Sequence, residues 1–491
     1  MSDANTAPPK IPPGHGSDDG SDHVLDHATA TLAGLDRREC LACAVGAAAT
    51  AVLPTTALPS TAQAQSAATQ AGRTANFAHP WLTDRIVEAV ASGNPPNRVS
   101  LTPRGLTVGL CGAVQHYRAL VEKGGWPTVP DIGQWMEFDT DDPAVATLRH
   151  RLRRTGDLPS NQDNGQTRFD GDLAQAVSVF QARHGLTADG VVGPATLAEL
   201  NVPANVRLAT LVINIERARQ WAKDYGSRFI AVNIAASRLH LIEDGESIFD
   251  TKVIVGRIDR TTPIIHSKIT RIDYNPYWYC PDSIARRDLL PAIQTDPDYF
   301  WNNGIRVYDT FGPGMTEIPA EEIDWYTYNG LENLPYKFRQ DPGPWNVLGP
   351  VRFMFDNNHS VYLHGTSNED LFEKALRTFS SGCVRVDQAV DISAHLATQQ
   401  DGWDVARVQR LIENYKTRSV TLNNPMPVHL IYRTAWVEHD GSVQFRPDIY
   451  DWDAVLDINW GHVANVPCVY GVRETAGKQV VQGQTGARQG G

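Results

Sequence analysis

The sequence predicts an α+β protein, in which helical units come first and a mainly β domain follows. Three observations predict this fold class. Apolar residues recur at helical spacing between residues 65 and 205, and they alternate with period two from Phe229 onward. The dipeptide Asp244-Gly245 separates two strand-like runs, which is a strong hairpin signal. At 491 residues the chain is long enough for about three domains.

Residues 1–64 are predicted to be a leader with an export signal. The first 36 residues are rich in Pro, Gly, Asp and His and show no apolar periodicity. Arg37 and Arg38 then precede an uncharged apolar run and the small-residue stretch TAQAQ, a pattern typical of a twin-arginine signal peptide. The run is too short to span a membrane, and Pro54 ends it. We therefore expect a periplasmic protein with no membrane span after signal removal. The alternative is an Ala-rich linker.

Composition and cysteine spacing exclude several classes of partner. The formal net charge of -12 leaves no basic surface for nucleic acid. Of the six cysteines, two lie in the leader, and the other four are scattered without metal-ligand spacing. We therefore expect no metal, no cofactor and no nucleic-acid partner. Whether Cys111, Cys280 and Cys468 form any disulfide stays open at this stage.

Two helical units follow the leader. Residues 65–140 are predicted to be a helical scaffold, which includes the pattern LCGAVQHYRALVEKGGW. Residues 141–205 carry three helical patterns, with Gly185 at a helix end that favours the left-handed conformation and Pro194 at the start of the third helix. The string FQARHGLTADGVVGPATLAELN resembles the three-helix peptidoglycan-binding domain found beside many wall enzymes. A helical spacer without a ligand is the alternative.

Residues 226–420 are predicted to form the β domain. Its first hairpin turns at Asp244-Gly245, and strand character returns at VRFMFDNNHSVYLHGT. Residues 275–349 interrupt the alternation with Pro, Trp, Tyr and short helical runs, so we interpret them as an insertion. Residues 421–491 are predicted to hold a second hairpin, which turns at Asp440-Gly441, and a frayed Gly/Gln-rich tail.

One histidine and one cysteine carry the candidate chemistry. His364 ends the strand-like run SVYLH, and Cys383 follows 19 positions later at a Ser-Gly turn before an apparent helix. A helix start and Arg385 would lower the pKa of the thiol, which predicts a thiolate–imidazolium pair. Gly382 would let the amides of Gly382 and Cys383 face an oxyanion. On these residues alone, a structural thiol remains the alternative.

The wider string HGTSNEDLFEKALRTFSSGCVRV resembles the active-site motif of the YkuD-type L,D-transpeptidases, in which a histidine precedes a Ser-x-Gly-Cys-x-Arg segment. Strings such as YNPYWYCPDSIARRDLLP resemble the long YcbB-like branch over about residues 140–455. The resemblance implies that Cys383 is the nucleophile and that His364 is the base, oriented by the backbone carbonyl of Gly365. It implies that Arg385 binds a stem-peptide carboxylate or buttresses the loop, with an ordinary ion pair as the alternative.

The resemblance draws attention to three further features. Tyr362 shares a strand face with His364 and would either line the pocket or merely pack. Ser381 stands where many relatives have a histidine, so an oxyanion role for its side chain is in doubt. The insertion at 275–349 resembles a lid that caps the substrate, and its aromatic residues would alternatively form a satellite core.

The function implied is the formation of 3,3 cross-links in peptidoglycan. Cys383 would attack a tetrapeptide donor, expel the terminal D-alanine and pass the acyl group to the amine of an acceptor stem. Peptidoglycan stem peptides are thus the expected substrates, and carbapenem-type molecules the expected inhibitors. Two alternatives within the family are an L,D-carboxypeptidase or endopeptidase and an enzyme that anchors a lipoprotein to the wall. An alternative of another class is a catalytically silent wall-binding scaffold.

Overall fold

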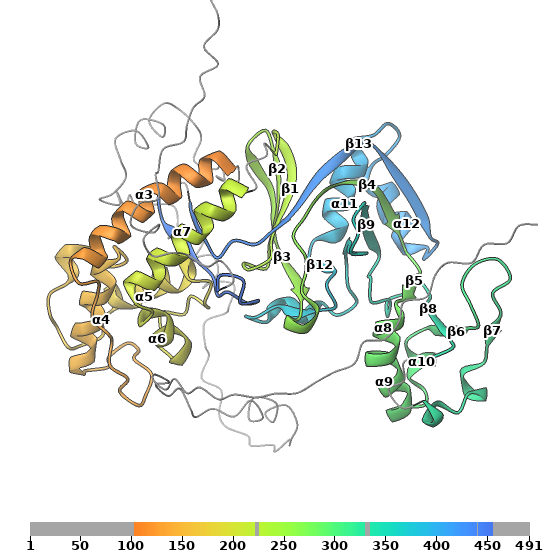
Figure 1. Ribbon diagram of the computed structural model, residues 1–491, viewed down its shortest axis with the longest axis horizontal. Coiled ribbons are helices and arrows are strands. Elements are labelled where there is room, and N and C mark those ends of the chain that lie inside the picture. The colour runs from red at the N-terminus through yellow and green to blue at the C-terminus, as the bar shows by residue number, and fades with distance from the viewer. Residues whose placement is uncertain (1–102, 221–224, 329–333, 439, 455–491) are drawn as a thin grey trace, which may run out of the picture. The chain divides into compact units, whose positions relative to one another are not determined.

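The computed structural model describes residues 103–220, 225–328, 334–438 and 440–454 (Figure 1). The predicted leader, its export signal, Cys468 and the predicted tail therefore lie outside the described residues. In the part of the chain that is described, no helix is both long enough and apolar enough to cross a membrane.

Five α-helices precede the first strand of the described chain: α3 (Pro103–Glu122), α4 (Pro143–Arg154), α5 (Gly171–Arg183), α6 (Pro194–Leu200) and α7 (Ala204–Gln220). The three helices predicted for residues 141–205 are α4, α5 and α6. Asp142 and Asp170 cap the first two through hydrogen bonds to backbone amides, which satisfies donors that a helix start leaves open. A short 3₁₀ turn (Ser160–Gln162) lies between α4 and α5. The three helices pack around one core that includes Leu148, Phe169 and Phe180.

A separate core joins α3 and α7. It holds Leu110, Val114 and Tyr117 of α3 together with apolar residues of α7. We did not predict α7, although Leu208, Leu211 and Ile215 repeat at helical spacing and would have indicated it.

Nine strands form the sheet of the β domain: β1 (Arg228–Asn233), β2 (Arg238–Glu243), β3 (Glu246–Gly256), β4 (Ile265–Tyr274), β9 (Val351–Phe355), β10 (Leu363–His364), β11 (Thr378–Ser380), β12 (Val384–Val386) and β13 (Arg418–Ile431). Their order is β11-β3-β12-β10-β9-β4-β13-β1-β2, and β2 also pairs with β3. Because the long strand β3 pairs with β2 first and with β12 further on, the ladder closes on itself. The predicted Asp244-Gly245 turn joins β2 to β3, with positive φ at both residues.

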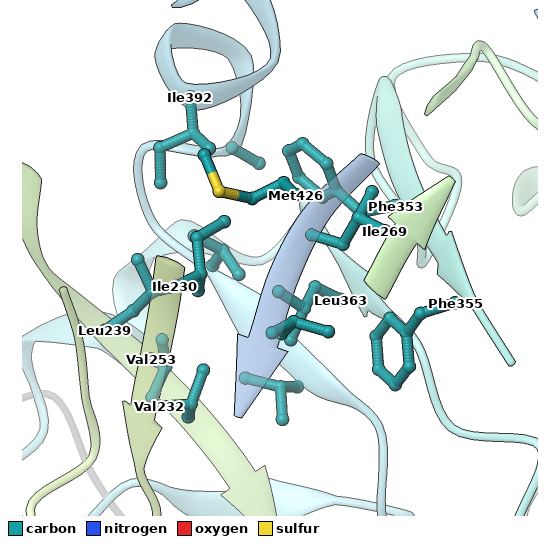
Figure 2. Packing of buried hydrophobic residues seen from close by; sticks show 14 of the residues in the cluster. Ile230, Val232, Leu239, Val253, Ile269, Phe353, Phe355, Leu363, Ile392 and Met426 are labelled. Atoms are coloured by element: carbon teal, nitrogen blue, oxygen red, sulfur yellow. The ribbon is translucent and has the colours of Figure 1, made fainter. Parts of the chain in front are cut away.

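The core of this domain lies on one face of the strands. Figure 2 shows part of it, with Val253, Phe353 and Leu363 among the apolar side chains that come from different strands. Two helices, α11 (Ala389–Thr398) and α12 (Val405–Glu413), contribute Ile392 and Val408 to the same core. Alternate residues of these strands therefore remain available to form a site on the other face.

The insertion has secondary structure of its own. A four-stranded sheet in the order β5-β8-β6-β7 is accompanied by short helices. These elements are β5 (Trp278–Cys280), α8 (Asp282–Ile284), a π-turn (Ala285–Leu289), α9 (Leu290–Thr295), α10 (Tyr299–Asn302), β6 (Ile305–Tyr308), β7 (Glu317–Ile318), two 3₁₀ turns (Ala320–Glu322 and Trp325–Thr327) and β8 (Lys337–Gln340). Phe300, Trp325 and Phe338 are buried in its core. Some of the aromatic residues thus form a satellite core, whereas Trp301 and Tyr326 are exposed. We use the word lid below as a name for residues 275–349.

The C-terminal end of the domain differs from the boundary that we predicted at residue 420. Strand β13 runs to Ile431 between β4 and β1, so the sheet of the β domain extends beyond that position. The second hairpin is shorter than predicted, with β14 (Ala435–Val437) paired to β15 (Val443–Phe445). Its apolar side chains belong to the core of α3 and α7 and not to the β domain.

Candidate active site

The predicted site residues come from two parallel neighbouring strands. In the pairing of β10 with β12, His364 lies opposite Arg385, and the amide of Val384 donates to the carbonyl of Tyr362 at 3.1 Å. Alternate residues of a strand share a face, so Tyr362 and His364 lie on the same side as Cys383 and Arg385. Leu363 and Val384 point into the core instead. The structure therefore brings thiol, imidazole, phenol and guanidinium together.

The turn before the thiol is fixed by hydrogen bonds. The Ser380 hydroxyl accepts from the Gly382 amide at 3.1 Å and donates to the Cys383 carbonyl at 2.5 Å. The Thr262 hydroxyl donates to the Gly382 carbonyl at 2.9 Å. Gly382 adopts φ +109°, which only glycine reaches easily. The Ser380 side chain thus shapes the turn before the thiol.

This turn changes the prediction for the oxyanion donors. The Gly382 amide, which we expected to face an oxyanion, is already engaged by Ser380. The amide of Cys383 donates no hydrogen bond to any described residue. Because strand β12 follows the thiol and α11 begins only at Ala389, no helix start lies beside Cys383, contrary to our expectation.

The surroundings of Cys383 favour the neutral thiol. Burial raises its pKa above the ordinary value, and the amide and hydroxyl of Tyr362, with Arg352 and Arg385, only partly offset this. The sulfur donates to the Ser360 carbonyl at 3.9 Å.

The imidazole of His364 is also neutral. The side chain is buried, and burial together with the charges of Arg385 and Arg352 lowers its pKa to about 3. The backbone of Gly365 and Leu348 opposes this shift, and the orienting role of the Gly365 carbonyl stays a prediction. Neither carbonyl meets hydrogen-bond geometry, and Nδ1 has no partner among the described residues. Both directions of shift disfavour the thiolate–imidazolium pair that we predicted.

Arg352 was not predicted, and it connects the site to the rest of the sheet. It lies opposite His364 on β9, and its guanidinium donates to Asp273 at 2.7 Å. Asp273 also accepts from Ser419 at 2.7 Å and pairs with Arg271 at 2.9 Å. An arginine inside the apolar strand VRFMF was the signal that could have identified it.

Arg385 contrasts with Arg352, because it has no acidic partner. No ion pair or hydrogen bond joins its guanidinium to any described residue. Burial lowers its pKa, and the neighbouring Cys383 opposes the shift. An ordinary ion pair, the alternative that we considered for this arginine, is not present in the described part of the chain.

The lid contacts the site at two places. Arg260 donates to Asp288 of the lid at 2.7 Å and, through the same nitrogen, to the Ser381 hydroxyl at 2.8 Å. Tyr362 packs against the lid core. The Ser381 hydroxyl is therefore held by an arginine. Buried Cys280 also lies in the lid core.

No cluster of three or more metal-ligating side chains occurs in the described ranges. The groups present are a thiol, a neutral imidazole, a free backbone amide and an unpaired guanidinium. Together they suit nucleophilic acyl transfer.

Two family models match the chain. Residues 227–408 match the "L,D-transpeptidase catalytic domain", and residues 141–200 match the "Putative peptidoglycan binding domain". A curated protein of Haemophilus influenzae named "Putative L,D-transpeptidase" is 34% identical over 253 residues, which cover 51% of this chain and 50% of that protein. The match thus spans half the length of that relative.

Among solved structures, the L,D-transpeptidase of Stackebrandtia nassauensis is 14% identical and covers 62% of this chain and 96% of its own, with a TM-score of 0.23. The L,D-transpeptidase of Xylanimonas cellulosilytica is 16% identical and covers 62% of this chain and 100% of its own, with a TM-score of 0.18. The assignment rests on the family models and the curated relative. The chain therefore carries a YkuD L,D-transpeptidase catalytic domain at residues 227–408, together with a peptidoglycan-binding domain.

Proposed function

We propose that the chain is an active L,D-transpeptidase that forms 3,3 cross-links between peptidoglycan stems through a thioester on Cys383. The observation that carries this proposal is the shared face of β10 and β12. It holds His364, Cys383 and an unpaired Arg385 next to one another. The family domain and the peptidoglycan-binding domain give the chemical class of the substrate.

The proposed first half-reaction forms the thioester. The Cys383 sulfur attacks the carbonyl carbon of the third stem residue while its proton passes to His364. The amide bond to the terminal D-alanine then breaks, and that proton goes to the departing amine. The free Cys383 amide is the donor available to the oxyanion.

The second half-reaction consumes the thioester. The amine of the third residue of an acceptor stem attacks the thioester carbonyl, and the carbon–sulfur bond breaks. His364 takes the proton of the attacking amine and returns it to the sulfur. No external energy source enters, because one amide bond is exchanged for another.

Arg385 has a double role in this scheme. Its unpaired guanidinium would bind a carboxylate of the stem peptide. Since the charge of Arg385 helps to lower the pKa of His364, a bound carboxylate would offset that charge and make the imidazole a better base. Binding of the substrate carboxylate would thus increase the basicity of His364, which deprotonates Cys383.

Intact-mass spectrometry of the purified protein tests the nucleophile. Incubation with a carbapenem should add one adduct mass, and Cys383→Ala should abolish it. Cys280→Ala is the matched control, because that thiol lies in the lid core. No adduct, or an adduct that survives Cys383→Ala, would favour the silent wall-binding scaffold.

Digestion of the cell wall tests the acceptor. A strain that expresses the wild-type protein should contain 3,3-linked dimers that a Cys383→Ala strain lacks. Shortened stems without dimers would instead indicate a carboxypeptidase or endopeptidase, and lipoprotein fragments linked to stems would indicate an anchoring enzyme.

We also propose export to the periplasm by the twin-arginine route, supported by Arg37, Arg38 and the apolar run that follows. Replacing both arginines by lysine should leave the precursor uncleaved in the cytoplasm. Normal processing of that variant would contradict the proposal. We further assign the chain to the long YcbB-like branch, on the size of its lid.

A further inference from the structure

The lid contains a cleft that the proposed acyl transfer does not use. Its volume is about 820 Å³, within the range of small-molecule sites. Two indole rings line it: Trp301, which is 86% exposed, and Trp345, which is 42% exposed. Large aromatic side chains left in water beside a cleft commonly mark a binding surface.

Trp345 is held in place by the backbone around it. A methyl group at Gly304 would lie 2.2 Å from its Nε1, and one at Gly343 would lie 2.6 Å from its Cε2. Only glycine permits this approach, so the ring lies close against the backbone and forms part of the wall of the cleft.

The same residue connects the cleft to the catalytic strand. The backbone carbonyl of Trp345 accepts from the Ser367 hydroxyl at 3.4 Å, and Ser367 lies three positions after His364. Leu348 lies three positions after Trp345, and its backbone raises the pKa of the His364 imidazole. One short segment therefore borders the cleft and also reaches the base.

Polar groups line the rest of the cleft. Arg306 pairs with Glu317 at 2.8 Å and with Asp341 at 2.6 Å. The side chains of Asn302 and Glu321 also line the cleft, and no hydrogen bond or ion pair to a described residue occupies them. An amide and a carboxylate offer both donors and acceptors to hydroxyl groups.

We infer that this cleft binds a neutral saccharide, namely the glycan strand to which the stem peptides are attached. The apolar face of a sugar ring fits an indole, and its hydroxyl groups fit the amide and carboxylates of the rim. The cleft is lined by one arginine, Arg306, and by three acidic residues: Glu317, Glu321 and Asp341. This excess of negative charge would repel an anionic polymer. The inference that the cleft binds a saccharide stands on the cleft itself. Its identification of that saccharide as the peptidoglycan strand rests on the proposed function.

Calorimetric titration of the full chain with the tetramer of N-acetylglucosamine tests the inference without any catalytic step. Trp301→Ala should weaken binding by about tenfold, as expected when one aromatic platform is removed. Trp301→Phe should restore part of the affinity. Two controls should keep full affinity at the lid: Tyr326→Ala, an exposed lid aromatic outside the cleft, and Trp135→Ala in the helical part.

Substrate comparison gives a second readout. A disaccharide-tetrapeptide should have a KM about tenfold below that of the free tetrapeptide, and Trp301→Ala should remove this advantage while kcat stays unchanged. Unaltered saccharide binding in Trp301→Ala, or no binding by the wild type, would overturn the inference. A protein that binds the saccharide but forms no thioester would instead refute only the proposed function.

Discussion

The surroundings of Cys383 and His364 favour the neutral form of both side chains. A thiol with a raised pKa beside an imidazole with a pKa of about 3 has little thiolate at neutral pH. The two arginines that flank the site are the groups through which a bound carboxylate could change this balance. In the proposed reaction, the reactivity of Cys383 would therefore depend on occupancy of the site.

Alkylation of Cys383 by neutral iodoacetamide should show this directly. The pKa of the thiol is raised, so the thiolate fraction and the alkylation rate should keep increasing through the ordinary thiol value of about 8.5, with no plateau near neutrality. Stopped samples analysed by mass spectrometry give the rate, and Cys383→Ala gives the background. A plateau between about pH 5 and 7 would instead indicate a thiolate–imidazolium pair.

The two serines before the thiol should respond differently to removal of their hydroxyls. Ser380→Ala leaves the Gly382 amide and the Cys383 carbonyl without their partner, so it should lower the free energy of unfolding by about 1–3 kcal/mol and slow carbapenem acylation. Ser381→Ala is the matched control, since its more exposed hydroxyl contacts only Arg260, and it should change stability by less than about 0.5 kcal/mol. Chemical denaturation and adduct kinetics measure both. Equal effects would contradict the roles assigned here.

The motif alone was enough to predict which residues meet, but not their protonation. His364, Cys383 and Arg385 follow from a local string, and the pairing of β10 with β12 places them together. Their pKa values depend on burial and on Arg352, which lies on another strand and was not predicted. Burial of this kind is set by distant parts of the chain, so a local pattern cannot reveal it.

At the scale of elements, the lid and the nucleophile turn share one arginine. Arg260 lies in a 3₁₀ turn (Ile258–Arg260) after β3 and donates to Asp288 of the lid and to Ser381 of the turn. Arg257 lies 3.6 Å from the same carboxylate. A movement of the lid would therefore change the position of Arg260 and, through Ser381, the turn that carries the thiol.

Arg260→Met should loosen this connection. We expect faster hydrogen exchange in residues 282–295 and acylation slower by about threefold to tenfold, because a charge-assisted hydrogen bond is lost on each side. Lys337→Met is the control, since the Lys337–Asp282 pair lies within the lid and does not reach the turn. Exchange mass spectrometry and adduct kinetics provide the two measurements. Identical behaviour of both variants would show that Arg260 does not couple the elements.

Elements with local signals were predicted well, and those fixed by distant partners were not. The Asp244-Gly245 hairpin and the capped helices α4 and α5 follow from neighbouring residues. Strand β13 pairs with β1 and β4, which lie more than 140 positions earlier, so nothing near residue 420 indicates that the sheet continues. Likewise, alternating apolar residues predict that a sheet forms. They do not predict that the pairing of β2 with β3 closes it.

At the scale of the whole molecule, the chain returns after the catalytic sheet to complete the core of its helical part. The hairpin β14–β15 supplies Val437 and Phe445 to the core of α3 and α7. Phe445 also lies near His184 at the end of α5, with ring centroids 5.6 Å apart. The Asn214 side chain of α7 donates to Thr434 at 2.8 Å. In the sequence, the sheet of the β domain is therefore flanked on both sides by segments that pack together.

Removing Phe445 should test whether these segments are one folding unit. Its ring is 1% exposed and contacts Tyr117 and Arg207 as well as His184, so Phe445→Ala should cost about 3–5 kcal/mol. Phe138→Ala, on a ring that is 63% exposed, should cost less than about 0.5 kcal/mol. Hydrogen exchange should rise in α3, in α7 and at the end of α5 together, while carbapenem acylation of Cys383 persists at low temperature. If hydrogen exchange rose only in the hairpin β14–β15, the core of α3 and α7 would be stable without the hairpin. The C-terminal segment would then not belong to the same folding unit.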